Sequence, residues 1–483
     1  MEARRDQLLL SLLLCSASSA VASLPATLPA EPAGAAMGSQ LARTVQLLEA
    51  SSQPGQPPVR VLFYGQSIVE QGRLQSTFIA ELKKQFPGAQ INAVSTAIGG
   101  YMAPKLVRTT PHTVVFARPD LIVFDDYGGD KDGTYEEIIH YLRSHTTADV
   151  ILWSPHVDNF NAAMDKQRDA EGEFRRSIAE KYKCEFADVR AVWKQYLEES
   201  KLPRTALLRD PIHNTTDGCE LIARILARHF VKSDAAPSNA VQTIALNDAG
   251  ARSAAGVTLG GDWASNASGI SASAEGATVS IAFTGTRLDV LGITEPPAAG
   301  TMSVEVDGQP PSKIPAAWAV SLPSPAPVGW FPAVNRVSVG QTPLVRDDWT
   351  LHFHDVSPDG KTYRFELKGK LSGSDGEGES GKDFGSTSGR FSILASDVTL
   401  AETARVLKKP MPATFDVTFR TFPLGRDLYQ QKPGDHQVLL TLVDGLPNTR
   451  HTLKLTLTGG AATLRGLVVH CPQWSDSPDP ASK

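Results

Sequence analysis

Short apolar runs alternate with longer amphipathic stretches between residues 58 and 232. The runs are short and mostly apolar, which is typical of strands that are buried on both faces of a parallel sheet. The stretches between them carry apolar residues at helical spacing and charged residues elsewhere. The pattern therefore predicts an α/β/α fold with a parallel sheet between two layers of helices. The expected strands are residues 59–64, 91–94, 121–124, 150–153 and 184–189, and the expected helices are 69–86, 135–144, 165–183 and 218–230.

After about residue 233 the apolar positions alternate with polar ones, and Ser, Ala, Gly, Thr and Pro become more frequent. A period of two is typical of strands that bury one face. We therefore expect an accessory β-sandwich of jelly-roll type, formed by residues 240–315 together with 431–473. The segment 316–430 between them is either a large insertion in the sandwich or a second small β module. Within it, residues 372–388 are rich in Gly, Ser and acidic residues, and they are expected to form a mobile loop.

The first residues have the pattern of an export signal. Arg4 and Arg5 give a positive start, an apolar run follows at 8–14, and small residues suited to cleavage stand at 20–22. We therefore expect a signal peptide over residues 1–22 and a secreted or periplasmic protein. A short hydrophobic helix or a membrane anchor is the alternative, although the run is too short to span a bilayer comfortably.

Lipid attachment at Cys15 is disfavoured, because Leu14 is too large for the residue before a lipoprotein cysteine. The next segment, residues 23–57, is rich in Ala, Pro and Ser and is expected to be a linker into the first domain. One short helix is expected within it, around residues 40–49.

The charge of the chain is nearly balanced, with 47 basic against 52 acidic residues. A general nucleic-acid-binding protein would carry a basic patch or stripe, so this class is excluded. Behind the expected signal the cysteines are Cys184, Cys219 and Cys471, and their spacing is not that of a metal site. Export would permit a Cys184–Cys219 disulfide, and two buried free thiols are the alternative.

Two short motifs carry the residue types of nucleophilic acyl transfer. Ser67 follows the strand at 59–64, where a strand-to-helix turn presents a hydroxyl above the sheet. Asp210 precedes His213 by three residues, so one turn can supply both a general base and the carboxylate that orients it. The alternative is that Ser67 and Asp210 only cap the helices that follow them, a common role for these residue types.

At these residues the chain resembles the SGNH (GDSL-type) hydrolase family, over about residues 58–232. Residues 65–67 stand where that family has Gly-Asp-Ser, with Gln66 in place of Asp, and residues 210–213 match its Asp-x-x-His block. Residues 97–100 resemble the block whose glycine donates a backbone amide to the oxyanion, a role that the resemblance gives to Gly100 beside Ser67. The resemblance implies a flavodoxin-like three-layer domain and serine esterase chemistry, with no metal or organic cofactor.

The chain departs from the family at the block that normally reads Gly-x-Asn-Asp, where Gly129 stands in the place of the Asn. The usual side-chain donor to the oxyanion is therefore missing or comes from elsewhere. Polar residues near the expected site are candidates for substrate binding: Gln66, Tyr127, His156 and Asn159. The carboxylates Asp125, Asp126 and Asp130 are unlikely replacements, because negative charge there would oppose a developing oxyanion.

Together these features predict an exported serine esterase that removes O-acyl groups, most plausibly O-acetyl, from a carbohydrate. Two alternatives stay open: a polysaccharide O-acetyltransferase with the same triad, and a non-catalytic glycan-binding protein. Trp318, Trp330, Phe331 and Trp349 gather in the segment 316–430. An exposed Trp there could stack on a sugar ring, although a small hydrophobic core is the more common use of such a cluster. The oligomeric state, the acyl group and the sugar are not fixed by the sequence.

Overall fold

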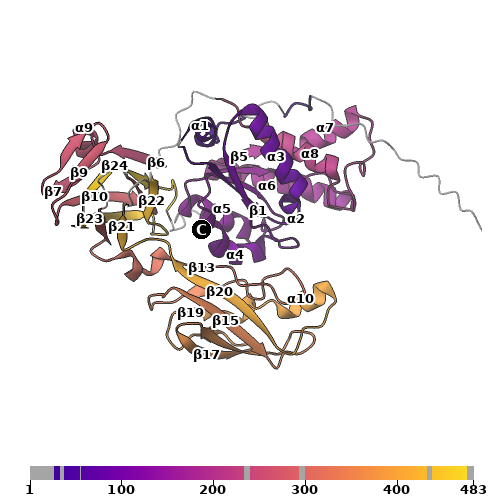
Figure 1. Ribbon diagram of the computed structural model, residues 1–483. Coiled ribbons are helices and arrows are strands. Elements are labelled where there is room, and N and C mark those ends of the chain that lie inside the picture. Colours follow the sequence, from indigo (N-terminus) through magenta and orange to yellow (C-terminus); the bar gives the residue numbers. More distant parts are fainter. Residues whose placement is uncertain are drawn as a thin grey trace, which may run out of the picture.

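A computed structural model describes residues 27–32, 37–54, 56–232, 240–292, 300–431 and 438–475. The predicted signal peptide lies outside the described residues. Figure 1 shows three units: an α/β unit within residues 27–232, a β-sandwich, and a second β unit that covers residues 318–423. Over the described ranges, no helix combines the length and the apolar character needed to cross a membrane.

The α/β unit is built on a five-stranded parallel sheet with the strand order β2-β1-β3-β4-β5. This is the flavodoxin-like order, in which the chain reverses direction beside β1 and ligands bind at the carboxyl ends of the strands. The predicted α/β/α fold is therefore confirmed. The strands are β1 Val59–Gly65, β2 Ile91–Ser95, β3 Leu121–Asp125, β4 Asp149–Trp153 and β5 Glu185–Ala187.

Helices cover both faces of this sheet (Figure 1). Val61 and Phe63 of β1 pack into one core, whereas Leu62 and Tyr64 pack into the other, because successive side chains of a strand point to opposite faces. The first core is closed by α1 Ala42–Ala50, α2 Ser67–Glu70, α3 Gly72–Gln85, α7 Val189–Glu199 and α8 Thr216–Ala227. The second core is closed by α4 Ala103–Ala117, α5 Thr134–His145 and α6 Ala162–Tyr182.

The sequence pattern does not predict α4 or α7. Pro111 lies inside α4 and disguises it, since proline is rare in helix interiors. The start of α7 follows β5 closely, where Asp188 caps it by accepting a hydrogen bond from the Ala191 amide. The single helix expected over residues 69–86 is divided into α2 and α3, because Gln71 has an extended backbone conformation.

Most of the segment expected to be a linker is part of the α/β unit. Leu48 of α1 is fully buried in the first core. The Arg43 guanidinium pairs with Asp120 at 3.0 Å, and the Thr44 amide donates to Asp149 at 2.8 Å. The short helix expected around residues 40–49 is therefore α1, and its few large apolar residues anchor it to the unit.

Two antiparallel sheets form the predicted β-sandwich around one apolar core. Their orders are β21-β12-β23-β10-β7 and β22-β11-β24-β9-β8, and β6 pairs with β24. A short helix, α9 Ala249–Ala254, follows β6. The strands are β6 Val241–Ala245, β7 Thr258–Gly260, β8 Ala264–Asn266, β9 Gly269–Ala272, β10 Thr278–Gly285, β11 Arg287–Gly292, β12 Thr301–Val306, β21 Leu428–Gln430, β22 Val438–Val443, β23 Thr449–Gly459 and β24 Ala462–His470.

The second β unit enters the chain between β12 and β21, so it is inserted in the sandwich and yet has a core of its own. Its sheets have the orders β13-β20-β15-β16-β17 and β14-β19-β18. The expected mobile loop at 372–388 instead contains β17 and β18, because β17 completes a sheet by pairing with β16. The elements are β13 Trp318–Val320, β14 Ser338–Val339, β15 Asp347–His354, β16 Arg364–Gly369, β17 Gly373–Glu379, β18 Phe384–Gly385, β19 Phe391–Ile393, α10 Leu400–Leu407 and β20 Phe415–Pro423.

Buried polar contacts hold the second β unit against α4. His112 Nδ1 donates to the Val320 carbonyl at 2.8 Å, and Nε2 accepts from the Val337 amide at 3.1 Å. Burial lowers the pKa of His112 to about 4, so at neutral pH the ring is neutral and Nε2 can accept. Arg108 adds a bidentate ion pair with Asp397, at 2.8 and 2.7 Å. These contacts fix the second β unit against α4.

The three cysteines of the described residues are free thiols. Cys184 packs into the core on one face of the parallel sheet, and Cys219 packs into the core on the other. The sheet therefore separates the two sulfur atoms, and the free-thiol alternative holds for this pair.

Gly65, at the end of β1, cannot be replaced without moving β3. Its φ of +132° is rarely adopted by other residues, and an added Cβ would lie 1.8 Å from the Asp125 carbonyl oxygen. We expect Gly65→Ala to lower the free energy of unfolding of the α/β unit by more than about 3 kcal/mol. Differential scanning calorimetry measures the change.

The matched control is Gly72→Ala at the start of α3, where an added methyl group meets open space. This variant is expected to be neutral, or stabilising by up to about 1 kcal/mol. Equal melting temperatures for the two variants would contradict the close approach of β1 and β3.

Candidate active site

Ser67 lies at the sharp turn between β1 and α2, at the carboxyl edge of the sheet. Gly65 allows the turn by approaching the backbone of Asp125 on β3, and the Gln66 amide donates to the Asp125 carbonyl at 3.1 Å. The Ser67 side chain is partly exposed, whereas Ile68 and Val69 behind it are buried. The turn thus presents the Ser67 hydroxyl at the surface, next to residues that are buried in the core.

His213 and Asp210 complete a linear array with this hydroxyl. Ser67 Oγ lies 3.0 Å from His213 Nε2, and His213 Nδ1 lies 2.7 Å from Asp210 Oδ2. The second oxygen, Oδ1, accepts from the Ile212 and His213 amides at 3.0 and 2.7 Å. Asp210 therefore fixes both its own loop and the orientation of the imidazole ring.

Asp210 is a carboxylate throughout the neutral pH range. Its partial burial raises the pKa, but hydrogen bonds from the His213 and Ile212 amides and from the His213 ring outweigh this effect and lower the pKa to about 2. A carboxylate on Nδ1 keeps a proton there, so Nε2 of the neutral ring is free to accept the Ser67 proton.

Gln66, which replaces the family's Asp, links Ser67 to a buried ion pair. Its Oε1 lies 2.8 Å from Ser67 Oγ, and its Nε2 donates to Asp125 Oδ2 at 3.0 Å. The other oxygen of Asp125 accepts from Arg175 Nη1 at 2.8 Å. Because the hydroxyl carries one proton, it can donate either to Gln66 or to His213, and only the second orientation prepares proton transfer.

Arg175 of α6 was not predicted from the sequence, where it is one charge among many in a long helix. Its guanidinium is almost fully buried and also donates to the carbonyl oxygens of Trp153 and Asp126. It therefore contacts the carboxyl ends of both β3 and β4. Asp126 itself is fully buried, and burial raises the pKa of its carboxyl well above the usual value, so neither Asp125 nor Asp126 presents a free charge to the site.

The amides of Ser67 and Gly100 are the available donors beside the hydroxyl. Across the described parts of the chain, neither amide makes a hydrogen bond. The Gly99 backbone lies against the Glu70 carboxylate, because an added Cβ there would be 2.5 Å from Glu70 Oε2. A Cβ at Gly99 would lie 3.6 Å from the Ser67 Cβ, which brings this loop directly beside the hydroxyl. The arrangement suits an oxyanion with two backbone donors.

Gly129 cannot take over the role of the missing Asn. An added Cβ would lie 2.5 Å from the Tyr135 amide nitrogen and 2.7 Å from the Ala103 side chain. The loop after β3 therefore closes against the starts of α4 and α5 and leaves no room for a side chain at this position. No other side-chain donor takes its place among the hydrogen bonds described for the site.

Tyr127 and His156, predicted to bind substrate, are instead buried beneath the Asp210–His213 loop. His156 Nε2 donates to the Ile212 carbonyl at 2.6 Å, and the Tyr127 hydroxyl lies 3.1 Å from His156 Nδ1. Asn159 is exposed, and its amide donates to the Pro211 carbonyl at 2.8 Å. The His156 side chain therefore holds the loop from below with Tyr127 behind it, and Asn159 adds a contact from its backbone amide.

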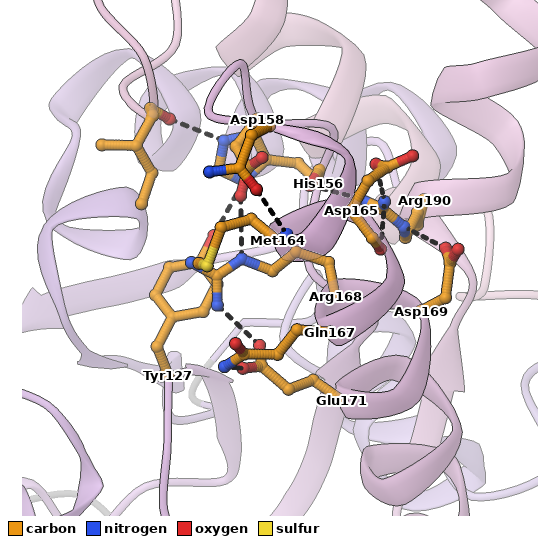
Figure 2. A network of polar contacts seen from close by, with 12 residues as sticks. Tyr127, His156, Asp158, Met164, Asp165, Gln167, Arg168, Asp169, Glu171 and Arg190 are labelled. Atoms are coloured by element: carbon orange, nitrogen blue, oxygen red, sulfur yellow. Dashed lines mark hydrogen bonds and ion pairs between the residues drawn. The ribbon is translucent and has the colours of Figure 1, made fainter.

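Figure 2 shows the polar network around His156 and Tyr127. Arg168 pairs with Asp158 at 2.8 Å and lies over the Tyr127 ring, 4.3 Å from its centroid. Arg190 donates to the His156 carbonyl at 3.1 Å and pairs with Asp169 at 2.6 Å. The network connects α6 and α7 to the loop that carries His213. Within the described ranges, no group of His, Cys, Asp and Glu side chains could hold a metal ion.

No protein-family model matches the chain, and a comparison with curated proteins gives no match. Among solved structures, the acetylxylan esterase Axe2 of Geobacillus stearothermophilus is similar over 36% of this chain and 94% of its own, with 20% sequence identity and a TM-score of 0.33. A two-domain esterase (CEX) active on acetylated mannans is similar over 90% of this chain and 96% of its own, with 13% identity and a TM-score of 0.32. The chemistry of this chain is therefore inferred from its own site.

The buried Arg175–Asp125 ion pair beneath Ser67 is expected to contribute to the stability of the α/β unit. Arg175→Met removes the cation and leaves Asp125 buried without its charged partner, which we expect to lower the free energy of unfolding by about 3–5 kcal/mol. The double variant Arg175→Met/Asp125→Asn removes both charges and should recover a large part of this loss. Urea unfolding of the single and double variants measures both effects.

Arg405→Met is the matched control, because Arg405 makes only an exposed 3.5 Å pair with Glu402 on α10. Its effect should stay within about 0.5 kcal/mol. A double variant that is less stable than Arg175→Met would show that charge pairing is not the role of Arg175.

Proposed function

We propose that this chain is a serine esterase with Ser67 as nucleophile, His213 as general base and acid, and Asp210 as the carboxylate that orients His213. The observation that carries the proposal is the linear array from Ser67 Oγ through His213 to Asp210, at 3.0 and 2.7 Å. Helix capping does not explain these residues, because Gln66 is the N-cap of α2 and Thr215 is the N-cap of α8.

In the proposed acylation, Ser67 Oγ attacks the ester carbonyl carbon while its proton passes to His213 Nε2. Negative charge then develops on the carbonyl oxygen, where the Ser67 and Gly100 amides can donate. The resulting imidazolium is stabilised by Asp210, whose low pKa keeps it ionised. His213 gives its proton to the departing alcohol, and the acyl group remains on Ser67.

Deacylation repeats the same steps with water as the nucleophile. His213 takes a proton from water, the second tetrahedral intermediate uses the same two amides, and the carboxylic acid leaves as Ser67 recovers its proton. Apart from the ester and water, the groups used in these steps all belong to the chain. The family pattern has two backbone donors and an Asn side chain, whereas this chain has Gly129 in the place of the Asn. Stabilisation of the transition state therefore depends heavily on the placement of the Gly100 amide.

The exposed position of the triad supports a small acyl group on a large carrier. The Asp210 side chain is 41% exposed, and His213 also reaches the surface. A long acyl chain would need a deep apolar pocket, whereas an acetyl group that projects from a polymer can reach an open site. We therefore propose that the substrate is an O-acetylated carbohydrate, which an exported enzyme would meet outside the cytoplasm.

The triad is tested by hydrolysis of p-nitrophenyl acetate and of acetylated oligosaccharides. Ser67→Ala and His213→Ala should each lower kcat by roughly 1,000-fold or more, and Asp210→Asn by a comparable factor, because the three groups act as one unit. Initial rates with each substrate, together with thermal unfolding curves, separate loss of chemistry from loss of folding.

His352→Ala is the matched control. His352 also pairs with an aspartate, Asp416, at 2.7 Å, but on an exposed face of the second β unit. Its activity should equal that of the parent. Full activity in Ser67→Ala would remove the assignment of Ser67 as nucleophile, and an inactive parent protein would remove the esterase assignment.

A further inference from the structure

An exposed tryptophan of the second β unit stands at the rim of the candidate active site. The Trp330 indole N–H donates to the Gly99 carbonyl at 2.8 Å, across 231 residues of sequence. Trp330 is 54% exposed, whereas Trp318 and Trp349 of the same unit are 9% and 1% exposed. The core explanation therefore applies to Trp318 and Trp349 but not to Trp330.

The neighbouring Phe331 fixes the position of this ring. Phe331 is buried against Tyr101, with ring centroids 5.2 Å apart, and a Cβ on Gly100 would lie 3.3 Å from its ring. The Trp330 and Phe331 rings meet edge to face at 5.4 Å. Trp330 is thus held on one side by Phe331 and at its nitrogen by Gly99, while more than half of its surface stays open.

The geometry brings the open indole next to the point of attack. Gly99 bridges the two sites, because its carbonyl binds Trp330 and its Cβ position lies 3.6 Å from the Ser67 Cβ. The open Trp330 ring is therefore close enough to contact a large ligand that binds at Ser67. A large apolar surface kept open beside a polar site is a common mark of ligand recognition.

A sugar ring fits such a surface. The face of an aromatic ring carries partial negative charge, and the C–H groups on one face of a pyranose offer partial positive charge and apolar area. The hydroxyl groups at the edge of the same sugar remain in water, so little desolvation opposes the contact. A rigid indole also loses little conformational entropy on binding.

We propose that Trp330 is a sugar-binding platform which holds the carbohydrate while its acetyl group enters the site at Ser67. This proposal rests on the proposed function and adds to it a subsite supplied by the second β unit. The insertion of this unit in the sandwich, and its attachment to α4 through His112 and Arg108, then serve to bring Trp330 to the catalytic edge.

The test compares two substrates for each variant, because p-nitrophenyl acetate has no sugar to bind. Trp330→Ala should lower the ratio of kcat/KM for acetylated oligosaccharide to kcat/KM for p-nitrophenyl acetate by roughly tenfold or more. Trp330→Phe keeps a ring and loses the N–H donor, so its ratio should stay close to that of the parent. Leu371→Ala, which changes an exposed apolar residue elsewhere on the second β unit, serves as control.

Two results would contradict the proposal that Trp330 is a sugar-binding platform. An unchanged ratio in Trp330→Ala, with both rates reduced together, would leave Trp330 as a support for Gly99 only. An unchanged ratio with both rates intact would leave it without a role.

Binding of acetylated xylo- and manno-oligosaccharides to the Ser67→Ala protein, with and without Trp330→Ala, gives a second readout. A loss of binding there supports the platform even if Ser67 is not the nucleophile, so the two proposals fail separately.

Discussion

The buried guanidinium of Arg175 is the constraint on which the site depends. Two strand ends meet around it, since it donates to Asp125 and Asp126 at the end of β3 and to the Trp153 carbonyl at the end of β4. Burial of a charge is unfavourable unless the surrounding groups pair with it. Asp125 also accepts a hydrogen bond from Gln66 at the end of β1, and Gln66 in turn contacts Ser67. The position of the Ser67 hydroxyl therefore depends on the buried Arg175–Asp125 ion pair.

The other half of the triad is held from a different side. His156 and Tyr127 support the Asp210–His213 loop from below, and Arg168 and Arg190 fix these two residues from α6 and α7. The second β unit holds the third part of the site, the Gly99–Gly100 loop, through Trp330 and Phe331. Three separate sets of contacts thus hold the groups around the Ser67 hydroxyl. They explain how the site can be exposed and still have a fixed geometry.

The sequence predicts the parts of this arrangement that are local. Short, mostly apolar runs identify the five strands of the parallel sheet. The rule that sites lie at strand ends finds Ser67, and the spacing of Asp210 and His213 finds the second motif. The sequence does not reveal the role of Arg175, because its partner Asp125 lies 50 residues away and Arg175 is one charge among many in a long helix. It includes Trp330 among the aromatic residues that could stack on a sugar, but not its contact with Gly99, which lies 231 residues away. Tyr127 and His156 were expected to face the substrate, since strand order alone does not say which side chains turn under the sheet edge.

The most direct test of the account is covalent labelling with a fluorophosphonate, which forms a stable bond only with an activated serine. Intact mass spectrometry and peptide mapping should show one adduct per chain, located on Ser67, and labelling should be lost in His213→Ala while His352→Ala is labelled like the parent. An unlabelled parent protein, or an adduct on a serine other than Ser67, would contradict the central claim that the Ser67–His213–Asp210 array is a working nucleophilic triad.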